Sequence, residues 1–314
     1  MRVTPSGSQS SPFIICNRTD RQANPDLLFD GQNFIVVWTD EGAGTHVICG
    51  ARVTPQGQVL DPNGKLLIGG TISWGSPRLA FDGANLMMAY KEGSISSGRV
   101  YGQRLTTDLD KIGDSFPISN STQRKEEVRI AYSGVNYLVA WMDRSFLNFE
   151  IKGRLVAKDG TVIGNDISIA TGLSQGSHFD LTFDGVYYLL VYSNGTTING
   201  QKVATDGNLV GSAFPIGSGN FPTVCYAQGN LLINYSKMNS DYDIYGTTDF
   251  TQVSDENVPS SADHRIKTIY AGAIRANPGD RFYDCLGRPV RPSKPGVYFL
   301  KRSNNTLIKV IKIR

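Results

Sequence analysis

Apolar segments recur along the first 250 residues, and similar polar turn residues separate them. Four short apolar segments end in Asp-Gly or Ser-Gly, and each is followed at once by an apolar run that closes on an aromatic residue. The segments are 27–31, 79–83, 130–134 and 181–185, with a weaker copy at 224–229, and the closing aromatic residues are Trp38, Tyr90, Trp141, Tyr192 and Tyr235. These aromatic residues lie 52, 51, 51 and 43 positions apart. The chain therefore contains five copies of one structural unit.

Each copy predicts four antiparallel strands. The Asp-Gly pair suits the positive φ angles of a tight hairpin turn, and the apolar run after it predicts a strand buried on both faces. A third strand carries a glycine, such as Gly102, and a short fourth strand contains Pro117 or Pro215 in two copies, which fits an outer edge. Units of this size with four strands match the blades of a β-propeller. The sequence predicts an all-β, five-bladed propeller over residues 1–252.

The beginning of the chain is expected to close this ring. The fifth copy supplies three strands and no fourth, whereas residues 12–15 resemble the fourth strands of the other copies. Residues 2–7 also repeat residues 52–57. We expect the N-terminal strand to pair with the strand around Ile244 and to complete the last blade, which leaves few free sheet edges.

The end of the chain differs from the repeats. Residues 253–263 are polar and contain Pro259, which is typical of a linker. Residues 264–314 hold several short apolar segments separated by turn signals, and the last one is rich in lysine. This pattern predicts a small C-terminal β-sandwich.

Composition excludes several classes of partner. The chain has 314 residues and a net charge of only +3, so neither nucleic acid nor anionic lipid is expected to bind it. No apolar run approaches the roughly 20 residues of a membrane-spanning helix, and the N-terminus lacks the apolar region of a signal peptide. The four cysteines lie far apart. No metal site and no cofactor are predicted.

Candidate chemistry is confined to the start of the innermost strands. Counting back from the turn glycines places Asp26, Arg78, Arg129, Asp180 and Thr223 at equivalent positions, which predicts a charged ring at one mouth of the channel. Three interpretations stay open: ion pairs between blades, a polar site for a sugar or peptide, and the carboxylates of a glycosidase. Trp74, in a connection without a counterpart in other copies, is either a ligand-stacking residue or packed locally. The three histidines occupy unrelated repeat positions, and no catalytic motif is present.

Two resemblances extend this picture. The repeats resemble the Phe-Asp-Gly-x-Asn-Tyr-Leu-Val-x-Trp segments of secreted bacterial propeller proteins. Residues 283–290 and 296–300, followed by a Lys/Arg-rich strand, resemble the C-terminal sorting domain of the type IX secretion system; the matching residues are Gly287, Arg288, Gly296, Tyr298, Lys309 and Lys312. The second resemblance implies export to the cell surface, with the secretion machinery as a partner of the C-terminal domain.

Together these observations predict an exported propeller that is not an enzyme and that binds glycans or proteins at the cell surface. The ligand-binding residues would be Asp26, Arg78, Arg129, Asp180 and Trp74. One alternative is a glycoside hydrolase or lyase of the five-bladed type. Another is a structural module of the surface.

Overall fold

The computed structural model describes residues 10–42, 46–70, 76–94, 96–145, 148–227, 230–238 and 242–247, together with five strands farther along the chain. The chain divides into two compact units, Met1–Thr247 and Thr248–Arg314. No described residue belongs to a helix that is long and apolar enough to cross a membrane.

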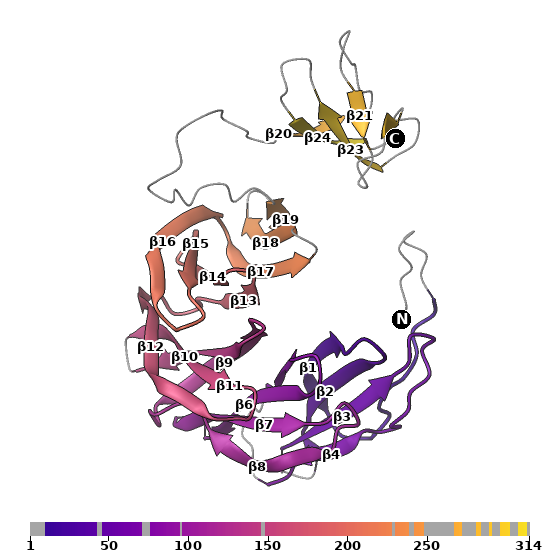
Figure 1. The fold of residues 1–314 in the computed structure, drawn as a ribbon, viewed down its shortest axis with the longest axis vertical. Coiled ribbons are helices and arrows are strands. Elements are labelled where there is room, and N and C mark those ends of the chain that lie inside the picture. Colours follow the sequence, from indigo (N-terminus) through magenta and orange to yellow (C-terminus); the bar gives the residue numbers. More distant parts are fainter. Residues whose placement is uncertain are drawn as a thin grey trace. The chain divides into compact units, whose positions relative to one another are not determined.

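The first unit is a ring of five antiparallel sheets (Figure 1), which confirms the predicted propeller. In every sheet the strands follow chain order from the centre outward. The first two blades are β1 (Gln22–Phe29), β2 (Phe34–Asp40), β3 (Val47–Val53), β4 (Lys65–Ile68) and β5 (Arg78–Phe81), β6 (Leu86–Gly93), β7 (Gly98–Leu105), β8 (Lys111–Pro117). The next two are β9 (Arg124–Tyr132), β10 (Asn136–Arg144), β11 (Phe149–Ala157), β12 (Val162–Leu173) and β13 (Phe179–Phe183), β14 (Tyr188–Asn194), β15 (Thr197–Val203), β16 (Leu209–Ser218). The fifth comprises β17 (Asn220–Ala227), β18 (Asn230–Met238) and β19 (Tyr242–Thr247).

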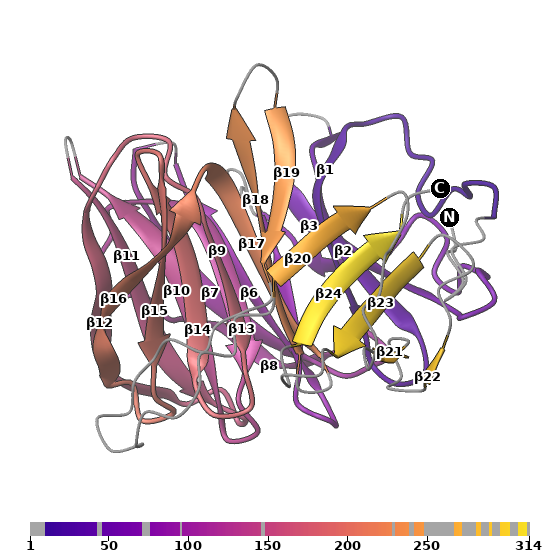
Figure 2. The same cartoon turned by 90° about the horizontal axis from the view of Figure 1, so that it is seen from above.

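Seen from the side, the strands of the third and fourth blades run roughly along the axis of the ring (Figure 2). The first strand of each blade contacts the first strand of the next, from β1 through β5, β9 and β13 to β17. Residues at the start of these inner strands are therefore gathered at one level around the centre. This arrangement places side chains from different blades in a common site.

The hairpin turns explain why the repeat contains Asp-Gly. Asp30 Oδ1 accepts hydrogen bonds from the backbone N–H groups of Gln32 and Asn33, at 2.7 and 2.6 Å. Asp82 and Asp184 make the same pair of bonds in their blades. The glycines after them have φ angles of 91–97°, a region that side chains with a Cβ rarely adopt. The turn chemistry thus sets the register of the two innermost strands.

The second strands carry the core, as their apolar pattern predicts. Trp38 is 4% exposed and Trp141 is fully buried, so both tryptophans are core residues rather than surface platforms. Continuous apolar clusters fill the space between neighbouring blades: one joins blades one and two, another blades two and three, and a third blades three and four. Each buried aliphatic or aromatic side chain contributes roughly 1.5–3 kcal/mol to folding.

The glycine of the third strand makes room for the fourth. A methyl group at Gly102 would lie 2.6 Å from Cζ of Phe116, and one at Gly200 would lie 2.5 Å from Cζ of Phe214. Both distances are far below van der Waals contact. The phenylalanine of the edge strand therefore covers the glycine, which accounts for the paired occurrence of these residues in the repeat.

The N-terminal segment lies elsewhere than predicted. Described residues 10–20 form no strand, and the fifth sheet has three described strands. Ile15 O accepts a hydrogen bond from the N–H of Asn63 at 3.3 Å, and the N–H of Asn17 donates to Asn63 Oδ1 at 3.0 Å. Ile15 packs near the buried Trp38 of the first blade, and Ile244 is 77% exposed. Ile15 is thus partly covered by blade one, whereas Ile14 is exposed, and the described part of the segment does not pair with β19. Residues 2–7 lie outside the described residues.

The second unit contains a five-stranded sheet in the order β20-β24-β23-β21-β22. Its strands are β20 (Lys267–Ala271), β21 (Arg281–Tyr283), β22 (Pro289–Val290), β23 (Gly296–Lys301) and β24 (Leu307–Lys312). The last strand pairs parallel with β20 and antiparallel with β23, so it lies inside the sheet. A sandwich stays a prediction, and the proposed linker at 253–263 lies outside the described residues.

Candidate active site

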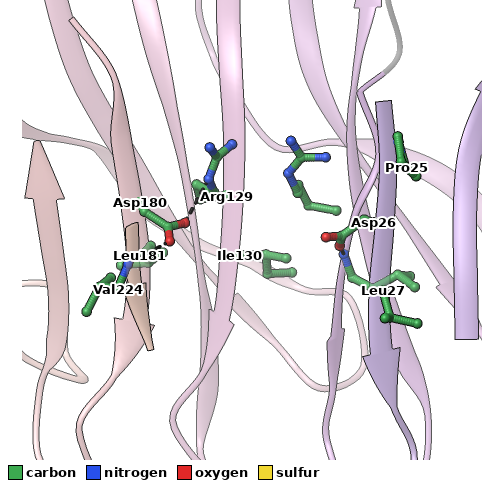
Figure 3. Close-up of a pocket in the computed structure, with 10 residues that line it drawn as sticks. Pro25, Asp26, Leu27, Arg129, Ile130, Asp180, Leu181 and Val224 are labelled. Atoms are coloured by element: carbon green, nitrogen blue, oxygen red, sulfur yellow. Dashed lines mark hydrogen bonds and ion pairs between the residues drawn. The ribbon is translucent and has the colours of Figure 1, made fainter. Parts of the chain in front are cut away.

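Four of the five predicted ligand-binding residues line one pocket. Asp26, Arg78, Arg129 and Asp180 come from β1, β5, β9 and β13 and surround a cavity of about 450 Å³ (Figure 3). The neighbouring residues in its wall are Pro25, Leu27, Leu79, Ile130, Leu181 and Val224. Thr223 is exposed, and the fifth blade contributes Val224 instead. The remaining predicted residue, Trp74, lies outside the described residues.

One part of the ring is used to hold blades together. Arg129 Nε donates to Asp180 Oδ1 at 2.8 Å, which joins the third blade to the fourth. Asp180 Oδ2 accepts the backbone N–H of Val224 at 2.9 Å, which joins the fourth blade to the fifth. Both carboxylate oxygens therefore have protein partners. This is the inter-blade ion pairing that the sequence left open as one interpretation of the ring.

Asp26 is bound more loosely on the other side of the pocket. Its Oδ2 accepts the N–H of Leu79 at 2.7 Å. The backbone N–H of Leu27 also hydrogen-bonds to the carboxyl group, and no ion pair of Asp26 is found among the described residues. Burial raises the pKa of Asp26, although the hydrogen bond from Leu79 and the positive charge of Arg78 oppose it. Burial thus favours the protonated form of Asp26, and backbone N–H groups rather than a cation hold its carboxyl group.

Arg78 forms no ion pair with a carboxylate in the described part of the chain. Its Nη1 donates to the carbonyl oxygen of Pro77 at 2.8 Å, and within the described ranges no carboxylate approaches it closely enough for an ion pair. Burial lowers the pKa of Arg78, and the like charge of Arg129 lowers it further. The charges of Asp26, Asp180 and Glu127 act in the opposite direction, but none of these carboxylates forms an ion pair with Arg78.

Glu127 is a third acidic residue that counting back from the turns did not find. It precedes Arg129 by two positions and interrupts the pairing of β9 with β10, with a φ angle of +31°. Its Oε2 accepts the N–H of Phe179 at 3.2 Å and lies 3.9 Å from Arg129 Nη2. The irregular backbone directs Glu127 toward the fourth blade, beside the arginine that lines the pocket.

His178 is the partner of Glu127. Its Nδ1 forms a short hydrogen bond with Glu127 Oε1. Burial acts to raise the pKa of Glu127, but the bond from His178 and the charge of Arg129 outweigh it, so the pKa is lowered. The bond to Glu127 raises the pKa of His178 against the effect of burial. The repeat pattern gave His178 no role, and the structure places its imidazole against the carboxylate of Glu127.

These two residues belong to a second set of equivalent positions. Non-glycine residues with positive φ angles recur two positions before each ring residue in four blades: Asn24, Ser76, Glu127 and Phe221. His178 holds the same position in the fourth blade. Phe221 is 57% exposed, and its ring centre lies 4.4 Å from that of His178. Counting back from each turn glycine to the position two residues before the ring residue would have found this set in the sequence.

The available chemistry is that of proton transfer and anion binding. No group of three His, Cys, Asp or Glu side chains suited to a metal ion occurs in the part of the chain that the structure describes. Asp26, Glu127 and Asp180 supply three carboxyl groups in three distinct states of bonding. The pKa values of Asp26 and Glu127 are displaced in opposite directions.

Comparisons with known proteins find a similarity of structure alone. No protein-family model and no curated protein matches the sequence. An α-L-arabinofuranosidase from Lactobacillus brevis is 10% identical, with a TM-score of 0.44, over 72% of this chain and 90% of that one. An endo-arabinase from Bacteroides thetaiotaomicron is 13% identical, with a TM-score of 0.42, over 75% and 96%. An α-L-arabinofuranosidase of glycoside hydrolase family 62 from Coprinopsis cinerea is 8% identical, with a TM-score of 0.43, over 74% and 91%.

This comparison contradicts the prediction of a propeller that is not an enzyme and only binds glycans or proteins at the cell surface, because the structures that share its fold are glycoside hydrolases. The prediction rested on a ring with only two acidic residues, and Glu127 adds a third. At such low identity the likeness shows the fold alone. The roles of individual residues must come from the geometry of the pocket.

The predicted sorting residues are only partly described. Gly287 and Arg288 lie outside the described residues. Gly296 and Tyr298 fall in β23, and Lys309 and Lys312 fall in β24. Their backbone positions place them on two paired strands of the second unit.

Proposed function

We propose that the propeller is an enzyme that hydrolyses glycosidic bonds in the pocket at the start of its inner strands. One observation carries the proposal: Asp26 and Glu127, from different blades, flank the same arginines and have pKa values displaced in opposite directions. A pair of carboxyl groups whose environments separate their pKa values supplies one proton donor and one proton acceptor. Hydrolysis of a glycosidic bond needs both.

Asp26 is the general acid of this proposal. Its raised pKa keeps more of the carboxyl group protonated at a given pH, and the bond from Leu79 fixes its orientation at the wall of the pocket. The proton passes to the glycosidic oxygen as the bond from that oxygen to the anomeric carbon breaks. The leaving sugar departs as an alcohol.

Glu127 is the general base. Its lowered pKa keeps it ionised, and each carboxylate oxygen has a second lone pair beyond its bond to His178 or Phe179. It takes a proton from the water molecule whose oxygen bonds to the anomeric carbon. His178 is a positioning residue, because it acts through Glu127. Exchange of protons with solvent then restores both carboxyl groups.

The proposal is tested by turnover of a polysaccharide panel, measured as newly formed reducing ends. Glu127→Gln is expected to reduce kcat by a factor of about 10²–10⁴, the usual contribution of general acid–base catalysis. Asp114→Asn is the matched control, because Asp114 is exposed on the edge strand β8, outside the pocket. Absence of turnover across the panel, or full activity of Glu127→Gln, would contradict the proposal.

For the second unit we propose a role in export, with the secretion machinery as its partner and the cell surface or exterior as the destination. Support comes from the resemblance of residues 283–314 to the sorting domain and from the position of the Lys-rich β24 inside the sheet. A chain ending at Thr247 is expected to stay inside a bacterium that has the type IX system, whereas the full chain reaches the surface. The fraction exposed on intact cells measures this. Equal export of both chains would exclude the role.

A further inference from the structure

The charged side chains of the pocket are not all engaged in ion pairs. Arg129 and Asp180 pair at 2.8 Å, and Glu127 is paired with His178. Asp26 is held by the backbone N–H groups of Leu79 and Leu27 instead of by a cation. Arg78 is left as the pocket cation without an ion pair in the described part of the chain. A partly buried guanidinium that lacks an anion is costly unless a ligand supplies one.

The surroundings of Arg78 also restrict what that anion can be. One nitrogen, Nη1, is bound to the carbonyl oxygen of Pro77, and the described residues offer no partner to the remaining donors. A guanidinium presents parallel N–H groups whose spacing matches the two oxygens of a carboxylate. The cavity of about 450 Å³ beside it is of the size that holds a small ligand such as a sugar residue.

We propose that Arg78 binds the carboxylate of a uronic acid, so that the substrate is an acidic polysaccharide with a uronate seated in the pocket. The inference rests on the proposed function, because it names the substrate class of the same site. The carboxylate of the sugar neutralises Arg78 and leaves Asp26 and Glu127 for proton transfer. The exposed ring of Phe221, near His178, gives the apolar face of a sugar a surface to pack on.

The test measures binding separately from turnover. Calorimetry on Asp26→Asn, which suppresses cleavage, compares two oligosaccharides that differ only in carrying a carboxylate or a hydroxymethyl group on C5. The acidic ligand is expected to bind about 10–100-fold more tightly, as charge-assisted hydrogen bonds do. Adding Arg78→Met to this protein should remove most of the preference, and Arg78→Lys should restore part of it.

Arg99→Met is the matched control, because Arg99 lies on β7 of the same blade and does not line the pocket. It should leave the preference intact. The preference of the parent protein should weaken with added salt, whereas that of the Arg78→Met protein should be insensitive to salt.

Several outcomes would overturn the inference. They are equal binding of the two oligosaccharides, a preference that survives Arg78→Met, and tighter binding of a sulfated neutral sugar than of the uronate. Cleavage of neutral glycans without any acidic preference would refute this inference and leave the proposed hydrolysis standing. Selective binding of uronates by a protein that cleaves nothing would do the reverse.

Discussion

Two acid–arginine combinations occupy equivalent positions in this propeller, and their bonding differs. In blades three and four, Arg129 and Asp180 pair at 2.8 Å, and Asp180 also accepts the N–H of Val224. In blades one and two, Asp26 accepts the N–H of Leu79, but Arg78 has no ion pair among the described residues.

The difference shows that a repeat position can serve either stability or chemistry. An aspartate at the start of an inner strand joins its blade to the next one by accepting a backbone N–H, and this occurs on both sides of the pocket. Whether the neighbouring arginine pairs with this aspartate then determines the role of the two side chains. Where it pairs with the aspartate, the group stabilises the ring; where it stays unpaired, both side chains are free to meet a ligand.

The largest expected effect is on kcat, which should fall much more when Asp26 is replaced than when Asp180 is replaced. Asp26→Asn should reduce kcat by about 10²–10⁴-fold, because the amide cannot donate the acid proton but can still accept the N–H of Leu79. Asp180→Asn should change kcat less than about tenfold, because Asp180 only positions Arg129. Initial rates on one polysaccharide measure both. Equal losses in the two variants would show that the aspartates do not differ in role.

The next effect is on the free energy of unfolding, which should depend on Arg129 more than on Arg78. Arg129→Met should lower the free energy of unfolding by about 1–3 kcal/mol, because it leaves the partly buried Asp180 without its partner. Arg78→Met should change it by less than about 0.5 kcal/mol, since it breaks no ion pair and relieves repulsion from Arg129. Urea unfolding followed by tryptophan fluorescence measures both values. A larger loss for Arg78→Met would show that Arg78 has a structural role.

The dependence of activity on pH tests the Glu127–His178 pair. Activity needs Glu127 ionised and Asp26 protonated, so kcat/KM should follow a bell-shaped curve. Removing the bond from His178 lets the pKa of Glu127 rise, and His178→Gln should therefore move the acidic limb to higher pH. The alkaline limb, which reports Asp26, should stay in place. A curve unchanged by His178→Gln would exclude the positioning role.

The smallest effect is on stability across pH. The raised pKa of His178 gives a contribution that is present below its ordinary value of 6.5 and is lost as pH rises through the folded value. The lowered pKa of Glu127 gives one that is present above 4.5 and is lost as pH falls through the folded value. His178→Gln should therefore cost most between those limits, by about 0.5–1 kcal/mol, since the imidazole is partly exposed. Thermal unfolding at pH 5.5 and 9 measures the difference, and an equal loss at both would contradict it.

The fold was predictable because its signals are local. The Asp-Gly turns and the two-sided apolar strands define each blade within about 20 residues, and the glycine of the third strand marks where Phe116 or Phe214 packs. The position of residues 10–20 was not predictable in this way. These residues could contact either blade one, which contains Asn63, or β19 of the fifth blade. The repeat pattern does not show which of the two contacts is more stable.

Residues of the candidate site could be predicted only where the two innermost strands of a blade keep a regular pairing register. Counting from the turn glycines found Asp26, Arg78, Arg129 and Asp180 because those strands pair regularly from the turn to that point. Glu127 was missed because the pairing of β9 with β10 becomes irregular just beyond it. Which arginine keeps an ion pair depends on side-chain geometry between blades, and the sequence of a single blade carries no information on it.

Residues with positive φ angles lie two positions before the ring residue in four of the blades, and this has a consequence for how such a ring can diversify. At Asn24, Glu127 and Phe221 the pairing of the inner strand shifts its register, and Ser76 lies just before β5, so these positions stand outside the regular ladder. An amide, a hydroxyl, a carboxylate and an aromatic ring are all accepted at this position. Each blade can thus carry a different side chain two positions before its ring residue, and new specificities can arise by single substitutions that leave the hydrogen-bonded sheets intact.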